Sequence, residues 1–177
     1  VNDVRGEEKY KTGPTESEDE IFAAVAQENA AISVMHNKGN SKTMNSLTET
    51  YENNDCASHV KQWLEQEVKQ LVEKYHIPKW NIWIDPGFGF AKTVEQNFEI
   101  LKRLDEFQQV HDQILVGTSR KRFVKSLVSQ ESSSFELDTA TSLTSLVAAQ
   151  KGGKLFRVHD VPSSQIALKL NNKLKQC

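Results

Sequence analysis

An apolar run that ends in a carboxylate and a glycine-rich turn is the strongest chemical feature of the sequence. Residues 81–84 are followed by Asp85, a proline and two glycines, Gly87 and Gly89. This pattern predicts a buried strand that delivers a carboxylate into a tight turn, because proline interrupts a strand and glycine permits angles and close approaches that a side chain blocks. Asp85 is therefore a candidate for chemistry, and a turn cap is an equally good interpretation of this stretch alone.

Three basic or imidazole side chains follow two later apolar runs. Arg157 and His159 are two residues apart, so in a strand they point to the same face, where a guanidinium beside an imidazole can hold a multiply charged anion such as phosphate. Lys121 stands where the apolar residues 114–116 give way to a turn, and could place a point charge over a ligand. Each of these residues alone is more often structural or solvated, so the other strand ends must decide.

Composition excludes several classes of protein. The 177 residues are 37% hydrophobic and 26% charged, which is typical of one soluble globular domain. A net charge of −2 provides no basic field for nucleic acid, and no apolar run approaches the ~20 residues that span a bilayer. Two cysteines, Cys56 and Cys177, form no disulfide framework, and no Cys/His spacing resembles a zinc site, so a reducing cytoplasm is expected.

Apolar periodicity alternates between the two kinds of element along the chain. Strands are expected at residues 1–4, 31–36, 81–85, 113–119 and 155–160. Helices are expected from about Asp19, over 60–75, after a cap formed by Thr93 with Gln96, over 138–151 and from about Pro162. This alternation predicts an α/β fold with a parallel sheet, either an open doubly wound sheet or part of a (β/α)8 barrel.

In both architectures, ligands bind at the carboxyl ends of the strands. Polar groups gather at these ends: Asn2 and Asp3, Met35 and His36, Asp85, Ser119 to Arg122, and Arg157 to Asp160. The chain contains no G-x-x-x-x-G-K-S/T, G-x-G-x-x-G or G-x-S-x-G motif, which disfavours a nucleotide-binding loop and a serine-hydrolase elbow.

These motifs, in their order, resemble the dihydropteroate synthase family. They are D-P-G-F-G-F-A-K at 85–92, G-T-S-R-K at 117–121 and R-V-H-D-V at 157–161, and N-D-V at 2–4 and M-H at 35–36 look like the two preceding strand ends. The resemblance covers essentially the whole chain. It implies that residues 1–177 form a single pterin-binding domain, an incomplete TIM barrel of about five β/α units that correspond to family strands 4 to 8.

The resemblance implies an enzyme of folate biosynthesis that joins p-aminobenzoate to 7,8-dihydropterin-6-ylmethyl diphosphate and releases diphosphate. The residues that it assigns are Asn2, Asp85 and Lys121 on the pterin edge, Met35 and Phe90 near its ring, Arg157 and His159 on the diphosphate, and Ser119 and Arg120 on the p-aminobenzoate side. Lys121, Arg157 and His159 form its expected catalytic set. A carboxylate can accept hydrogen bonds from both the amide and the amine of the pterin. In the family, neutralisation of the charge on the leaving diphosphate, with help from Mg²⁺, makes the main contribution to catalysis.

The sequence departs from the family in two ways. The family's first three strands have no counterpart in this sequence. Two family segments are missing with them: the loop whose Asn binds magnesium, and a Ser-Thr-Arg-Pro segment near p-aminobenzoate. We therefore interpret the chain as the carboxyl-terminal part of the enzyme, inactive alone, with no metal ligand of its own. Arg122 stands where many members have a serine that contacts p-aminobenzoate.

Partners and alternatives follow from the same resemblance. It implies a sulfonamide target and a homodimer packed through late helices. Two alternatives remain: a truncated paralogue that binds pterin without catalysis, and the pterin-binding domain of a methyltransferase. The pair Arg157 and His159 speaks against the second alternative, because a methyl carrier has no diphosphate to bind.

Overall fold

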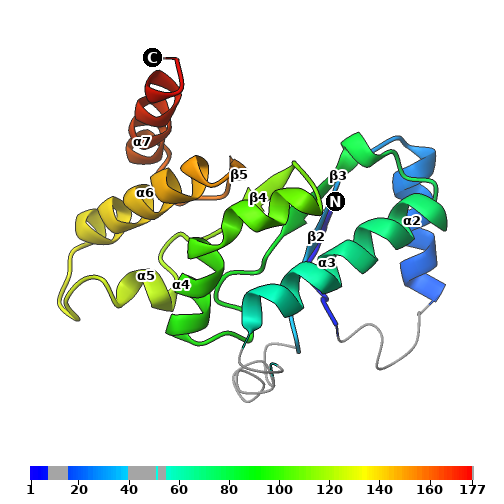
Figure 1. The fold of residues 1–177 in the computed structure, drawn as a ribbon, viewed down its shortest axis with the longest axis horizontal. Helices are drawn as coiled ribbons and strands as arrows, with labels where there is room; N and C mark the ends of the chain where they lie inside the picture. Colours follow the sequence, from blue (N-terminus) through cyan, green and yellow to red (C-terminus); the bar gives the residue numbers. More distant parts are fainter. Residues whose placement is uncertain (8–15, 40–50, 52–54, 177) are drawn as a thin grey trace.

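Five parallel strands form one sheet in the computed structural model, which describes residues 1–7, 16–39, 51 and 55–176 (Figure 1). The strands are β1 (Asn2–Asp3), β2 (Ile32–Met35), β3 (Ile82–Asp85), β4 (Ile114–Val116) and β5 (Gly153–Phe156). Each strand pairs in parallel with the next one along the chain. A doubly wound sheet reverses its strand order at a switch point, so the sequential order here is that of a barrel segment. The predicted α/β class is confirmed.

Helices connect successive strands. They are α2 (Glu16–Gln27), α3 (Cys56–Glu73), the 3₁₀ turn η2 (Lys79–Asn81), α4 (Val94–Lys102), the 3₁₀ turn η3 (Leu104–Gln109), α5 (Arg122–Lys125), α6 (Ser134–Gln150) and α7 (Val161–Leu174). Thr93 and Gln96 form the expected capping box at the start of α4, with reciprocal bonds between side chain and backbone. The side-chain and backbone bonds of this capping box satisfy two groups at the start of α4 that have no partner within the helix.

Some boundaries differ from those that the sequence predicts. Helix α6 begins at Ser134 instead of 138, because Ser133 and Glu136 form a second capping box ahead of the apolar residues. Strand β5 begins at Gly153 instead of 155, because Gly152 adopts a φ of +98° and turns the chain directly out of α6. The Arg157 N–H still donates to the Val116 carbonyl at 3.0 Å, so pairing continues one residue past β5.

The hydrophobic core lies between the sheet and helices α2 to α6. Alternate strand residues point toward these helices and are essentially fully buried: Ile32, Val34, Ile82, Ile84, Ile114 and Val116. They meet buried residues of the helix layer, including Leu64, Ile100, Phe107, Phe123 and Ala148. Burial of each large aliphatic side chain contributes about 1.5–3 kcal/mol, so this layer of contacts is the main support of the sheet.

The opposite face of the sheet borders an open cavity of about 500 Å³. Its lining includes Ser33 of β2, Trp83 of β3 and Leu115 of β4, which alternate with the residues of the core. Leu155 of β5 also lines it and is 43% exposed. In a closed barrel this face would be the interior, so the described sheet presents a barrel lining without the strands that would close it.

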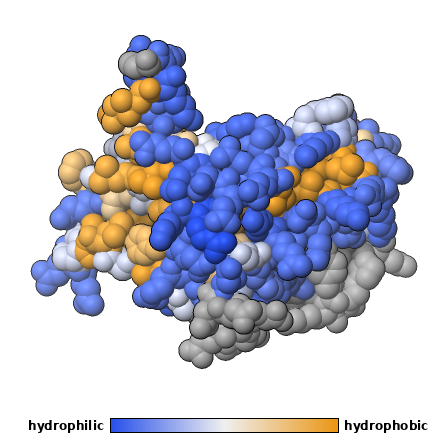
Figure 2. Space-filling model, in the orientation of Figure 1, coloured by the Kyte–Doolittle hydropathy of each residue, from blue (hydrophilic) through white to orange (hydrophobic). Residues whose placement is uncertain are grey.

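Helix α7 packs against α6 and projects from the rest of the molecule (Figure 1). Apolar surface gathers over α5, α6 and α7 in Figure 2. The exposed apolar side chains there include Phe135 and Leu143 of α6 and Ile166 and Leu170 of α7. Among the described residues, no helix is both long enough and apolar enough to cross a membrane.

Candidate active site

The carboxyl ends of the strands bring together residues that are far apart in the sequence. Met35, the last residue of β2, lies beside Asp85, the last residue of β3, in the parallel register. Next along the sheet, Gly117 follows β4, and Arg157 follows β5. A Cβ placed on Gly117 would lie 3.2 Å from Nη2 of Arg157, so the missing side chain makes room for the guanidinium.

Asp85 is a buried carboxylate whose position is set by the turn that follows it. Its side chain is 2% exposed, and Oδ1 accepts a 2.8 Å hydrogen bond from the Gly87 N–H. Among the described residues, Oδ2 accepts no hydrogen bond. Burial raises the pKa of Asp85, while the Gly87 N–H and the charge of Lys121 oppose that rise. One carboxylate oxygen is thus used for positioning and the other is left for a ligand.

The two glycines of this turn are required by its geometry. Gly87 has a φ of +70°, and a Cβ there would lie 1.8 Å from the carbonyl oxygen of His36. Gly89 has a φ of +78°, and a Cβ there would lie 2.7 Å from Cδ of Lys121. The turn therefore packs directly against the end of β2 on one side and against Lys121 on the other.

Lys121 reaches over the turn toward Asp85. Its Nζ donates to the Phe88 carbonyl and lies 4.2 Å from the centre of the Phe90 ring. Burial lowers the pKa of Lys121 to about 8, with the carboxylate of Asp85 opposing this and the charge of Arg157 adding to it. An ammonium, an aromatic face and a carboxylate are thus gathered at the end of β3.

A pocket of about 270 Å³ opens beside Lys121. It is lined by Gly117, Ser119, Lys121, Arg157, Val158 and His159. Ser119 Oγ lies 2.8 Å from the ring nitrogen Nδ1 of His159 and also accepts a 3.1 Å hydrogen bond from the backbone N–H of His159. These two contacts fix the imidazole at the rim of the pocket. Arg157 also lines the cavity on the open face of the sheet, together with Asn2 of β1. Positive charge therefore lines a small pocket next to the buried carboxylate.

Arg120 does not line this pocket. Its guanidinium forms a bidentate pair with Asp138 of α6, at 2.9 and 2.8 Å, and its φ is +56°. The neighbouring Arg122, the first residue of α5, is exposed. Of the residues expected near p-aminobenzoate, Ser119 lies in the pocket and Arg120 is held against α6.

The sequence did not indicate a buried polar chain beneath the turn. Lys92 is 1% exposed, and its Nζ lies 3.0 Å from Nδ1 of the buried His36. On its other side, His36 Nε2 lies 3.0 Å from Oε1 of Glu7, and Nε2 of His59 lies 2.6 Å from the same oxygen. Burial lowers the pKa of His36 to about 3 and that of Lys92 to about 8. No local sequence pattern places Lys92, His36, Glu7 and His59 together, because they come from segments far apart in the chain.

A parallel barrel segment with a cationic pocket and a recessed carboxylate at its strand ends has the architecture with which TIM-barrel proteins bind small molecules. The chain belongs to the pterin binding enzyme family, whose model matches residues 1–159.

Relatives of known activity are similar to most of the chain. The dihydropteroate synthase of Streptococcus pyogenes serotype M3 is 40% identical over 146 residues, which are 82% of this chain and 51% of the relative. The structure of the Thermus thermophilus dihydropteroate synthase with 4-aminobenzoate superposes with a TM-score of 0.82 at 32% identity, covering 98% of this chain and 62% of that one. The Xanthomonas albilineans enzyme in complex with 7,8-dihydropteroate gives a TM-score of 0.76 at 28% identity, over 88% of this chain and 55% of that one. The chain spans about half the length of the curated relatives that it matches.

Proposed function

We propose that the protein containing this chain is a dihydropteroate synthase, which transfers the dihydropterin methylene group from its diphosphate to p-aminobenzoate. The observation that carries this proposal is the placement of the buried Asp85 next to a pocket lined by Lys121, Arg157 and His159. A pterin needs a recessed hydrogen-bond acceptor for its amide and amine groups. The diphosphate that it carries needs clustered positive charge around its oxygens. The similar enzymes from Thermus and Xanthomonas, with 4-aminobenzoate and 7,8-dihydropteroate bound, support p-aminobenzoate as the substrate and dihydropteroate as the product.

Asp85 and Lys121 recognise the pterin in this proposal. Oδ2 of Asp85 accepts from the pterin edge, while Oδ1 stays on the Gly87 N–H. Lys121 donates to the ring from above, and Phe90, whose ring lies 4.2 Å from Nζ of Lys121, forms an aromatic wall. Met35, buried beside Asp85, and Asn2 on the open face complete the pterin side.

Arg157 and His159 stabilise the leaving group. As the bond between the pterin methylene and the diphosphate oxygen breaks, negative charge grows on the diphosphate, and the pocket between β4 and β5 lies ready with a guanidinium and an imidazole. The amine of p-aminobenzoate then attacks the methylene carbon and loses a proton. Ser119 orients His159 through their 2.8 Å contact, so a charged oxygen meets the Nε2 side of the ring.

Mg²⁺ is the cofactor that the proposed reaction implies, and the described pocket does not fit it. Mg²⁺ takes oxygen ligands, mostly carboxylates and phosphates, whereas this pocket offers lysine, arginine and histidine. The single group of three or more His, Cys, Asp or Glu side chains that converges within the described residues is Glu7, His36 and His59, which is mostly imidazole. We therefore assign Mg²⁺ binding to residues outside this pocket.

A homodimer in a reducing cytoplasm completes the proposal. Exposed apolar side chains on α6 and α7, such as Phe135 at 75% and Ile166 at 70%, favour a protein partner for these helices. Cys56 is a buried free thiol whose pKa burial raises to about 11, which suits a reducing compartment with no need for a disulfide.

Two substitutions in the full-length protein test the division of labour. Asp85→Ala should weaken binding of both the dihydropterin diphosphate and the hydroxymethyl dihydropterin that lacks it, by about 100-fold, because it removes a buried acceptor. Arg157→Ala should weaken only the diphosphate form, by about 10- to 100-fold. Calorimetric titration with both ligands measures this split. Unchanged pterin affinity in Asp85→Ala would contradict the assignment.

A further inference from the structure

Lys92 occupies a site that matches the three donors of an ammonium group. Its Nζ lies 2.9 Å from the Gly87 carbonyl, 2.9 Å from the Phe90 carbonyl and 3.0 Å from Nδ1 of His36. The two carbonyl oxygens can only accept, so Lys92 donates to both. Its pKa, lowered by burial to about 8, keeps it an ammonium at neutral pH, and the third N–H is directed at His36.

His36 passes this contact on to Glu7. Since Nδ1 accepts from Lys92, the proton of the neutral imidazole is on Nε2, which donates to Oε1 of Glu7 at 3.0 Å. Glu7 is held in turn by its backbone N–H, which donates to the Asn37 carbonyl at 2.7 Å. That approach requires Gly6, where a Cβ would lie 2.0 Å from the Asn37 oxygen. This series of hydrogen bonds therefore joins the loop after β1 to the turn after β3.

The same assignment of donors and acceptors distinguishes a hydrogen-bonded network from a metal site. Glu7, His36 and His59 place their ligand atoms within 4.8 Å of one another. A metal-bound histidine donates its other N–H to an acceptor, whereas the other nitrogen of His36 faces the ammonium of Lys92. The donor arrangement thus favours hydrogen bonds over metal coordination.

The peptide groups that Lys92 holds are those that aim the binding residues. Gly87, whose carbonyl accepts from Lys92, donates its N–H to Asp85 Oδ1. Phe90, whose carbonyl also accepts, carries the ring beneath Lys121. Ala91, which lies between Phe90 and Lys92 in the sequence, has a φ of +49°, a strained conformation that persists only where surrounding contacts enforce it. Its carbonyl accepts a hydrogen bond from the Tyr51 hydroxyl at 2.8 Å.

We infer that Lys92 is a positioning residue that fixes the Asp85–Phe90 turn for pterin recognition, and that His36 and Glu7 anchor it. This inference rests on the proposed function. Lys92 does not reach the ligand; it holds the backbone whose N–H and side chains do. Loss of its ammonium would remove the side-chain donor from the Phe90 carbonyl and leave the Gly87 carbonyl with only the Phe90 N–H, at 3.1 Å. The turn could then relax away from the geometry that Asp85 and Phe90 need.

The test uses two pairs of variants in the full-length protein. Lys92→Met keeps the length of the side chain and removes the donors, and Lys154→Met, at an exposed lysine paired with Asp112, is its control. His36→Asn retains an acceptor near the place of Nδ1, and His36→Leu has the same shape without one. Affinities are measured for hydroxymethyl dihydropterin and for inorganic diphosphate, with KM for p-aminobenzoate and the melting temperature of each variant.

We expect Lys92→Met and His36→Leu to weaken pterin binding at least 10-fold, with diphosphate affinity and the KM for p-aminobenzoate changed less than 3-fold. His36→Asn and Lys154→Met should stay within 3-fold of wild type for the pterin. Wild-type pterin affinity in both Lys92→Met and His36→Leu would overturn the inference, as would an equal loss for all three ligands, which marks general destabilisation. A wild-type protein that binds no pterin would instead refute the proposed function.

A metal titration closes the remaining possibility. Zn²⁺ added to the wild-type protein and to His59→Ala should give no stoichiometric binding that depends on His59, because His36 presents a protonated Nε2. Tight binding of one Zn²⁺ that is lost in His59→Ala would overturn the assignment of the cluster as a hydrogen-bonded anchor.

Discussion

Asp85, Lys121, Arg157 and His159 were predictable as neighbours because each lies at or just after the end of an apolar run in a parallel β/α pattern. The strand-end rule needs only the order of elements, which hydrophobic periodicity provides. Lys92 was not predictable as a buried charge, because its three acceptors come from backbone turns and from His36, 56 residues away. A lysine beside an alanine reads as solvated until the turn geometry is known.

Burial of His36 predicts an acid-sensitive fold. Its pKa falls from 6.5 to about 3 on folding, because burial and then the charge of Lys92 disfavour the imidazolium. Between these values the unfolded chain binds the proton and the folded chain does not, so stability is present above pH 6.5 and is lost as the pH falls toward 3. The expected loss is on the order of a few kcal/mol.

Urea denaturation at pH 7, 6 and 5 measures this dependence. His36→Asn removes the titrating group and should flatten the slope of unfolding free energy against pH. His76→Asn is the matched control, because His76 is exposed and asparagine tolerates its φ of +56°; it should keep the wild-type slope. Equal slopes in wild type and His36→Asn would contradict the prediction.

At the scale of elements, the order of strands and helices followed from periodicity, and only some of their ends followed from the sequence. The cap at Thr93 was predicted because a Thr and a Gln three residues apart precede an apolar stripe. The cap at Ser133 was missed because it lies within a run of serines in which no single position is marked. Side-chain networks between elements depend on packing distances that no local pattern contains.

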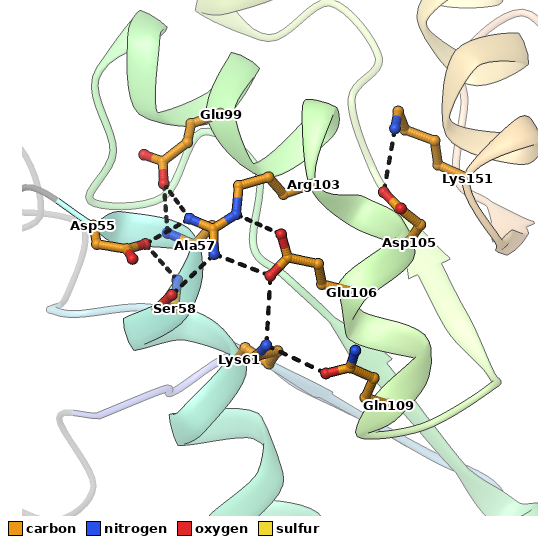
Figure 3. Close-up of polar contacts among 10 residues, drawn as sticks. All are labelled: Asp55, Ala57, Ser58, Lys61, Glu99, Arg103, Asp105, Glu106, Gln109 and Lys151. Carbon is orange, nitrogen blue, oxygen red and sulfur yellow. Dashed lines mark hydrogen bonds and ion pairs between the residues drawn. The ribbon is translucent and has the colours of Figure 1, made fainter.

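One such network joins the start of α3 to the end of α4 (Figure 3). The Arg103 guanidinium donates to Asp55 at 2.7 Å, to Ser58 Oγ at 3.0 Å and to both oxygens of Glu106 at 2.7 and 3.0 Å. Glu99 accepts a further bond at 3.1 Å. Asp55 also caps α3 by accepting from the Ser58 N–H at 2.9 Å, so a single cation orients a helix cap and a neighbouring helix.

Arg103→Met should therefore lower the free energy of unfolding by about 1 kcal/mol, since the participating side chains are partly exposed and solvent screens each pair. Lys151→Met, which removes a single exposed pair with Asp105, should cost less than about 0.5 kcal/mol. Urea denaturation in low and high salt measures both effects, and the gap between the two variants should narrow in high salt. A loss in Arg103→Met no larger than that in Lys151→Met would show that the network adds nothing.

At the scale of the whole molecule, α6 and α7 carry an apolar surface that the proposed dimer would cover. Leu170→Glu places a charge among exposed apolar side chains of α7 and should shift the full-length protein from dimer toward monomer in light scattering after size exclusion. Gln165→Glu, on the same helix, adds the same charge at an exposed polar position and should leave the dimer intact. A monomeric wild-type protein would contradict the prediction.

The open face of the sheet sets the last expectation for the chain. The barrel lining at Ser33, Trp83, Leu115 and Leu155 borders a cavity of about 500 Å³ instead of packing against further strands. Arg157 and Asn2 border the same cavity, so one side of the proposed pterin and diphosphate sites is open to solvent in a chain of these 177 residues alone. Charge stabilisation is strong only where water is excluded, and among the described residues no carboxylate that could bind Mg²⁺ lines the pocket. The purified 177-residue chain, supplied with both substrates and Mg²⁺, should therefore release dihydropteroate at less than about a thousandth of the rate of the full-length protein, as measured by chromatography of the product. Turnover by the isolated chain near the full-length rate would mean that the five strands suffice to exclude water and to bind both substrates.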